Sequence, residues 1–355
     1  MHIAPNSEII PPVRDGGTER VVSELTEELI QMGYDITLFA PKGSKSSGKI
    51  IHYPFLERDD EKIGRFVLEN LPENVDIIHD HTFSAAIGRF RNFHIPVVNT
   101  IHLPFQLNVN NPVYVSSNSL QVIGGGKGFY VHNGLRPEEF QFKSKKDDYL
   151  LFMGRLVREK GILHAINVAE SIGKKLVIAG PIHDPELFYN NIKPRLEKNP
   201  NLIYVGSVGG QQKQDLLKNA RCLLFPSTWD EPFGLVMIEA MACGTPVLTF
   251  NKGSVAEVMK GFPYMICSTT EEMIEKLKQP ELPVKPKNLR RYVIDFFTVN
   301  LMAENYLNIY KRILNINESL PYDPLIDNFP SYIQKYHYYQ NILPPLVSST
   351  VKTKK

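Results

Sequence analysis

The sequence lacks the features of secreted miniproteins and of nucleic-acid-binding proteins. Its 355 residues include only 3 cysteines, too few for a disulfide scaffold, and no Cys-x-x-Cys pair. The 40 Lys and Arg residues are balanced by 38 Asp and Glu residues, giving a formal charge of +2. No excess of positive charge favours a nucleic-acid or membrane-surface partner. Small-molecule chemistry is therefore the favoured class.

Targeting and membrane signals are also missing from the sequence. The stretch 92–126 contains no charged residue, but Asn, Pro, Ser, Gln and His interrupt it. A membrane helix needs about 20 mostly apolar residues, so none is expected. The first residues, MHIAPNSEII, do not have the basic and then apolar pattern of a secretion signal. Together with the unpaired cysteines, this predicts a cytoplasmic protein.

Short apolar runs alternate with segments whose apolar residues lie three or four positions apart. At 43% hydrophobic and 22% charged residues, the chain is long enough for about two domains. This alternation is typical of βαβ units in doubly wound parallel sheets. The predicted strands are Tyr34–Ala40, Asp76–His79, Pro96–Ile101, Phe129–His132, Tyr149–Met153, Lys175–Ala179, Leu202–Val205, Cys222–Phe225 and Pro246–Phe250.

The alternation is interrupted at 136–148, where RPEEFQFKSKKDD is charged and has little apolar periodicity. We place the linker between two Rossmann-like domains there. The prediction is an N-terminal domain over 1–140, a C-terminal domain over 141–314 and an extension over 315–355 that is rich in Pro, Tyr and Asn. Such domains bind ligands beyond the carboxyl ends of their strands, so the site is expected in the cleft between them.

The strongest functional motif is WDEPFGLVMIEAMACGTPV, residues 229–247, which follows a predicted strand. Pro232 suits the first turn of a helix, Gly234 allows close approach, and Leu235–Ala242 has good helix formers. Free N–H groups at such a helix start favour phosphate or sugar oxygens. Glu231 and Glu239 could then contact different parts of one elongated ligand. A capping carboxylate and a solvated helix residue are the alternative interpretation.

A second motif, FMGRLVREKGILHAI, places Arg155 and Lys160 in a loop between a strand and a helix that begins near Gly161. The planar guanidinium of Arg155 and the point charge of Lys160 could neutralise a diphosphate without a metal. Taken alone, an Arg and a Lys in a loop are more often simply solvated residues.

Two weaker signals lie in the N-terminal part. Gly16 and Gly17 directly precede a predicted helix, where the backbone could approach an anion or could simply form a tight turn. His79, Asp80 and His81 lie at the carboxyl end of one predicted strand, and His102 lies at the carboxyl end of the next. No further ligands stand at usable spacing, so a metal site is not expected. A polar contact from His102 to substrate and a core histidine bonded to backbone both remain open.

Taken together and in this order, GGTERVV, DIIHDH, VVNTIH, VHNG, LFMGRLVREKG, LVIAGP and DEPFGLVMIEAMACGTPV resemble glycosyltransferase family 4. These are retaining nucleotide-sugar transferases of GT-B fold, related to glycogen synthase. The resemblance runs from about Ile3 to Leu314. Two glutamates with seven residues between them, after the loop with Arg155 and Lys160, make it specific.

The resemblance implies a role for each matching position and no cofactor or metal. Arg155 and Lys160 would hold the donor diphosphate, Glu239 the ribose hydroxyls and Glu231 the transferred sugar. His102 would lie beside the sugar, and Gly16 and Gly17 would approach the phosphates. Backbone N–H groups would hold the sugar and the distal phosphate at Phe233, Gly234, Leu235 and Val236.

The resemblance implies transfer of a hexose with retention of configuration, with UDP-glucose as the expected donor. The acceptor would be a small molecule or a glycan that the sequence does not identify. The alternatives are a non-catalytic nucleotide-sugar-binding protein and a nucleotide-sugar epimerase of related fold. A nicotinamide dehydrogenase is disfavoured because no GxGxxG follows the first strand. The sequence departs from the family pattern at Arg136, where an Asp is usual, and in the short N-terminal domain.

Overall fold

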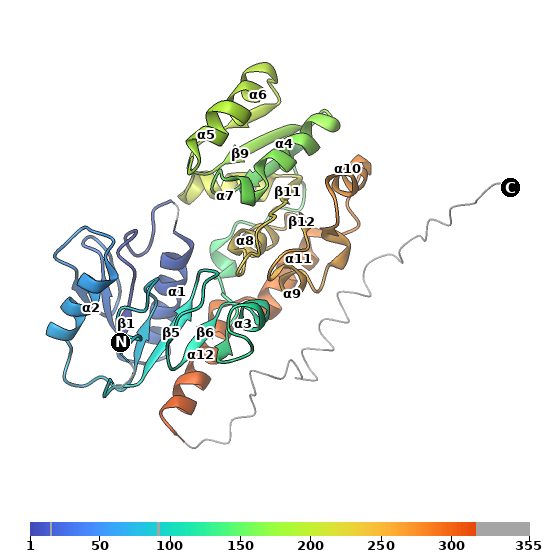
Figure 1. Ribbon diagram of the computed structural model, residues 1–355. Coiled ribbons are helices and arrows are strands. Elements are labelled where there is room, and N and C mark those ends of the chain that lie inside the picture. Colours follow the sequence, from blue (N-terminus) through green and yellow to red (C-terminus); the bar gives the residue numbers. More distant parts are fainter. Residues whose placement is uncertain (15, 91–92, 317–355) are drawn as a thin grey trace.

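Two parallel sheets, each flanked by helices, form the protein (Figure 1). The computed structural model describes residues 1–14, 16–90 and 93–316, so nearly all of the extension expected over 315–355 lies outside the described residues. The first sheet has 7 strands and the second has 6, and every pair of neighbouring strands is parallel. The α/β fold class predicted from the alternating pattern is confirmed.

The N-terminal sheet has the order β3-β2-β1-β4-β5-β6-β7. Its strands are β1 (His2–Ile3), β2 (Thr37–Ala40), β3 (Lys49–His52), β4 (Ile78–Asp80), β5 (Val97–Ile101), β6 (Pro112–Tyr114) and β7 (Phe129–Tyr130). The helices of this part are α1 (Gly17–Gln31), α2 (Asp60–Glu69) and α3 (Ser117–Val122). We call this sheet with its helices the N-terminal lobe.

The C-terminal sheet has the order β10-β9-β8-β11-β12-β13. Its strands are β8 (Tyr149–Met153), β9 (Lys175–Ala179), β10 (Leu202–Tyr204), β11 (Cys222–Phe225), β12 (Val247–Phe250) and β13 (Ile266–Cys267). Helices of this C-terminal lobe are α4 (Ile162–Ser171), α5 (Pro185–Leu187), α6 (Lys193–Lys198), α7 (Gly210–Asn219), α8 (Leu235–Ala242), α9 (Val255–Val258), α10 (Thr270–Lys278) and α11 (Pro286–Phe296).

Each of the nine predicted strands overlaps a strand of the structure, and only β4 extends beyond its predicted end, by one residue, to Asp80. Tyr149–Met153, Lys175–Ala179 and Cys222–Phe225 have the predicted bounds, because each is a continuous apolar run that fills the buried middle of a sheet. The prediction omitted four strands. They are β1, β3, β6 and β13. β1, β6 and β13 have only two or three residues each, and the edge strand β3 has polar residues at its exposed ends, so none of them gives a hydrophobic run.

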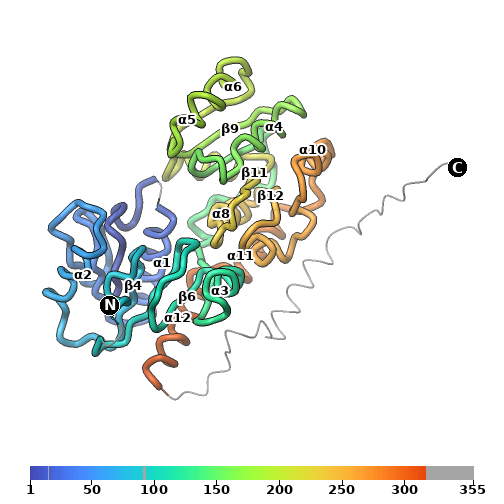
Figure 2. Tube along the Cα trace, in the orientation of Figure 1, coloured from blue at the N-terminus to red at the C-terminus, as the bar shows by residue number. Residues whose placement is uncertain are grey.

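The last helix of the described residues, α12 (Val299–Ile313), returns to the N-terminal lobe (Figure 2). Its buried face includes Met302, Tyr306 and Ile309, which share a hydrophobic cluster with Val21 and Leu25 of α1. An apolar stripe of this kind is buried against another element wherever one is available. The chain therefore crosses between the lobes twice within the described residues, once before β8 and once before α12.

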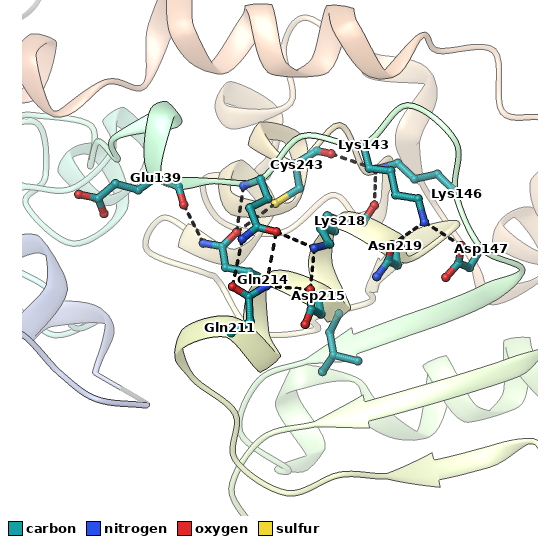
Figure 3. Close-up of polar contacts among 12 residues, drawn as sticks. Glu139, Lys143, Lys146, Asp147, Gln211, Gln214, Asp215, Lys218, Asn219 and Cys243 are labelled. Carbon is teal, nitrogen blue, oxygen red and sulfur yellow. Dashed lines mark hydrogen bonds and ion pairs between the residues drawn. The ribbon is translucent and has the colours of Figure 1, made fainter.

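The segment 136–148, which was predicted as the linker, joins the two sheets and lies against α7 (Figure 3). Gln141 N–H donates to Gln214 Oε1 at 3.1 Å, and Gln214 Nε2 donates to the carbonyl of Glu139 at 3.1 Å. Lys146 Nζ donates to the carbonyl of Cys243 at 3.0 Å, and its burial lowers the Lys146 pKa to about 8. The linker is thus bound to the C-terminal lobe through Glu139, Gln141 and Lys146. The limits of the two domains stay a prediction.

Arg136 opens the same segment and binds the N-terminal lobe instead. Its guanidinium lies 3.0 Å from Glu24 Oε2 and 2.6 Å from Glu28 Oε2, both on α1. Position 136, where the family usually has an Asp, is therefore occupied by an Arg that pairs with two carboxylates. An Asp could not bind them. A direct contact between the lobes is made by Glu257 of α9, which accepts from His132 Nε2 at 2.8 Å.

Candidate active site

Most of the predicted site residues lie at the switch points of the two sheets. Each sheet has the Rossmann strand order 3-2-1-4-5-6, with the reversal between β1 and β4 in the first and between β8 and β11 in the second. Ligands of such sheets bind beyond the carboxyl ends of the strands at that point. The loops after β1, β8 and β11 carry the glycine pair, the two cations and the Trp229 motif, respectively.

The loop after β8 places Arg155 and Lys160 in different surroundings. Arg155 is exposed, whereas the Lys160 side chain is only 14% exposed. The turn before Lys160 is fixed by the loop after β11, because the carbonyl of Glu159 accepts from the N–H of Thr228 at 2.9 Å. The next helix begins at Ile162 with Gly161 as its N-cap, as predicted. Lys160 is therefore the preorganised cation of the two.

Lys160 and Glu231 form an ion pair that their separate motifs do not predict. Lys160 Nζ donates to Glu231 Oε2, and the Glu231 side chain is 11% exposed. The ammonium also lies 5.9 Å from the centroid of the Phe225 ring at the end of β11. Burial of a carboxylate is tolerated when a cation neutralises it, so each side chain holds the other in place. The predicted phosphate and sugar residues are thus adjacent.

The loop that carries Glu231 is fixed from its far side by residues 253–254. Ser254 N–H donates to the carbonyl of Glu231 at 2.9 Å, and Ser254 Oγ donates to the carbonyl of Phe233 at 2.9 Å. A Cβ on Gly253 would lie 2.3 Å from the backbone nitrogen and oxygen of Glu231, so only glycine fits this approach. Phe233 itself is 2% exposed and is a packing residue whose backbone borders the site.

The helix α8 starts where it was predicted, at Leu235, and ends at Ala242. Its N-cap, Gly234, has φ of 81°, a left-handed conformation that other residues rarely adopt, and no side chain of the described residues caps the helix. Leu235 and Val236 are partly exposed. Pro232 does not open the helix, because the left-handed turn at Gly234 intervenes. The first N–H groups of α8 therefore remain available to an anion.

Glu239, on the second turn of α8, also pairs with a lysine. Its Oε1 atom lies 2.6 Å from Lys213 Nζ, with the glutamate side chain 4% exposed and the lysine 19%. Lys213 belongs to the first turns of α7. Lys213 does not stand out in the sequence, because the surrounding GQQKQDLLKN has the composition of an ordinary solvated helix.

The glycine pair of the N-terminal lobe reaches α8. Gly16 is the N-cap of α1, with φ of 116°. The helix begins at Gly17, so it includes the second glycine of the pair, whereas the prediction placed its start directly after the pair. A Cβ on Gly17 would lie 3.5 Å from Leu235 Cδ1. The start of α1 therefore faces the start of α8, so two helix N-termini from different lobes meet at one place.

His102 lies at the carboxyl end of β5, as predicted, and is not an ordinary core residue bonded to backbone. Its Nε2 atom is 3.0 Å from His81 Nδ1, and burial lowers the pKa of His102 to about 3. Asp80 is fully buried and accepts from the N–H groups of Thr82, Ile87 and Gly88, so it organises its own loop. No group of three or more His, Cys, Asp or Glu side chains in the described ranges could hold a metal ion.

Two family models match consecutive parts of the chain. Residues 136–279 match "Glycosyl transferases group 1", and residues 15–125 match "Glycosyltransferase Family 4". The chain belongs to glycosyltransferase group 1, family 4. The enzyme class and the GT-B fold expected from the sequence motifs are confirmed, and none of the described helices is long and apolar enough to cross a membrane.

Curated and solved relatives agree with this assignment. An uncharacterised glycosyltransferase of Methanocaldococcus jannaschii is 33% identical over 149 residues, which are 37% of this chain and 38% of that protein. AviGT4, a glycosyltransferase involved in avilamycin A biosynthesis, is 27% identical with a TM-score of 0.74, covering 88% of this chain and 97% of that one. Anabaena HepE, solved with UDP-glucose, has the same fold at 14% identity with a TM-score of 0.67, covering 88% and 98%.

Proposed function

We propose that this glycosyltransferase moves a hexosyl group, with glucose as the leading candidate, from a UDP-sugar to an acceptor hydroxyl with retention of anomeric configuration. The observation that carries the proposal is the pair of lysine–glutamate contacts, Lys160 with Glu231 and Lys213 with Glu239, at the two ends of one motif. They offer two separate polar positions to one elongated donor. HepE, a relative of the same fold, was solved with UDP-glucose.

Lys160 would bind the diphosphate while it keeps Glu231 in place. An ammonium has three donors, and only one is used in the contact with Glu231 Oε2. Arg155, on the exposed side of the same loop, adds a planar fork for a second phosphate oxygen. As the sugar leaves, negative charge builds on the diphosphate, and positioned cations stabilise that charge in the transition state. The free N–H groups at the first residues of α1 (Gly17) and α8 (Leu235) would stabilise the same negative charge.

The two glutamates would divide the donor between them. Glu231 is next to Lys160, and therefore next to the diphosphate, where its carboxylate can accept from hydroxyls of the hexose. Glu239 is on α8 beside Lys213 and is assigned to the ribose hydroxyls. No protein nucleophile is required if the leaving phosphate accepts the acceptor's proton on the same face of the sugar. The acceptor is not assigned.

The experiment is incubation of the full chain with a panel of nucleotide sugars, with UDP release measured with and without candidate acceptors. Calorimetry on the same samples gives the affinity for each donor. Acceptor-dependent release from a UDP-hexose supports the proposal. Donor binding without release under any acceptor would indicate a non-catalytic binding protein, and conversion of the donor sugar into an epimer without release would indicate an epimerase.

A further inference from the structure

His81 and His102 are joined by a hydrogen bond across neighbouring strands. His81 follows β4 and His102 follows β5, and these strands pair in parallel with Asp80 opposite Asn99. The Nδ1 atom of His81 lies 3.0 Å from Nε2 of His102, and the ring centroids are 5.3 Å apart. His81 is fully buried, whereas His102 is partly exposed. The contact therefore connects the core to the edge of the sheet that carries the site.

The ring of His81 is fixed by the residues beneath it. Its centroid lies 3.8 Å from that of His79. His79 in turn is held at both nitrogens, with Nδ1 2.5 Å from the Tyr310 hydroxyl and Nε2 2.6 Å from Thr100 Oγ1. Because Tyr310 belongs to α12, the helix that returns from the C-terminal lobe anchors this stack of rings. His81 has little freedom to rotate.

Both histidines of the pair are neutral. Burial, followed by the charges of neighbouring histidines, lowers the pKa of His81 well below its ordinary value, and burial lowers that of His102 to about 3. A neutral imidazole has one donor and one acceptor nitrogen. One of the two rings therefore donates in the contact between them and the other accepts. Which ring donates determines the nitrogen that carries the proton in both rings.

The second nitrogen of His81 decides which ring donates. His81 Nε2 is buried and has no hydrogen-bond partner among the described residues. If His102 donated, the proton of His81 would lie on Nε2 as a buried N–H without an acceptor. If His81 donates from Nδ1, only a lone pair is left unpartnered at Nε2. Orphaned buried N–H groups are rarer in proteins than under-satisfied acceptors.

We propose that His81 is a positioning residue that donates from Nδ1 to His102 and thereby keeps the proton of His102 on Nδ1. His102 then offers an N–H donor to a hydroxyl of the bound sugar. Free imidazole favours a proton on Nε2, so without His81 the ring of His102 would present a lone pair at the same place. This role rests on the proposed function, in which His102 contacts the donor sugar.

The test combines nitrogen spectra with kinetics. In the full chain labelled with ¹⁵N-histidine, the shifts of the ring nitrogens distinguish protonated from unprotonated sites at pH 7. We expect protonated Nδ1 on both His81 and His102. In His81→Phe, which keeps a ring but removes the donor, the proton of His102 should move to Nε2, UDP-hexose affinity should stay within about twofold, and turnover should fall by about tenfold or more.

Two further variants separate positioning from packing. His81→Asn keeps an N–H near the Nδ1 position and should recover part of the turnover, whereas His94→Phe, which replaces an exposed imidazole in the same lobe, should change nothing. A proton on Nε2 of His102 in the wild type, or full turnover in His81→Phe, would overturn the proposal. Absence of UDP release from every donor by the wild type would instead refute the proposed function, and the nitrogen spectra would still decide the proton positions.

Discussion

Replacing Lys160 by Met should separate the structural role of the Lys160–Glu231 pair from its role in catalysis. The side chains are 14% and 11% exposed, so the variant leaves a mostly buried carboxylate without the cation that neutralises it. Breaking a buried pair by removing one partner costs about 3–5 kcal/mol. Since each side chain keeps some contact with water, we expect a loss of about 2–3 kcal/mol in the free energy of unfolding.

The assay is denaturant unfolding followed by the fluorescence of Trp229, the protein's 1 tryptophan, which lies two residues from Glu231. The double variant Lys160→Met with Glu231→Gln removes the unpaired charge and should recover at least about 1 kcal/mol of the loss. Lys193→Met is the matched control, because Lys193 also has a carboxylate partner, Glu197, and an aromatic ring 5.5 Å away but is exposed. Its stability should change by no more than about 0.5 kcal/mol.

Turnover should respond differently from stability. A charge-assisted hydrogen bond to the leaving diphosphate contributes about 1.5–3 kcal/mol, so Lys160→Met should lower kcat/KM by about ten- to hundredfold. The double variant should recover stability but not activity. The reasoning is refuted if the single variant is as stable as the wild type, or if the double variant regains full turnover.

Four further outcomes are expected. Activity should survive EDTA, because side-chain cations serve the diphosphate, and loss that manganese restores would contradict this. Glu239→Ala should raise the Kd for the donor, measured by calorimetry, with a smaller effect on kcat than Glu231→Gln. Gly234→Ala should cost about 1–2 kcal/mol in denaturant unfolding, because its φ of 81° is left-handed. Burial, followed by the charge of Glu139, raises the pKa of Glu24 to about 7. The folded state therefore binds a proton that the unfolded state releases, so the free energy of unfolding should fall as pH rises from about 4.5 to 7. Glu24→Gln should flatten this pH profile.

The sequence predicted best the continuously apolar strands and the helix whose start is marked by a glycine. The run Cys222–Phe225 and the helix Leu235–Ala242 have the predicted bounds, since continuous burial leaves a hydrophobic run and a left-handed Gly234 marks the helix start. The edge strand Lys49–His52 was missed because its exposed ends carry polar residues. Local patterns determine such elements only where both faces are buried.

The partners of the site residues could not be read from the sequence. Lys213 and Glu239 are 26 positions apart, and their contact depends on how α7 and α8 pack. His81 was noted as a polar residue after a strand, but its bond to His102 follows from the pairing of β4 with β5. Motifs identify the side chains that a donor would meet, whereas the contacts that orient those side chains are made by the fold.

The anomeric configuration of the first product tests the central claim most directly. Full-length protein would be incubated with α-linked UDP-glucose and an acceptor that supports UDP release, and NMR would be recorded before the product can equilibrate. An α-linked first product is expected, because charge on the departing diphosphate is stabilised on the face where the acceptor enters. A β-linked first product would contradict both the proposed mechanism and the roles given to Lys160 and Glu231.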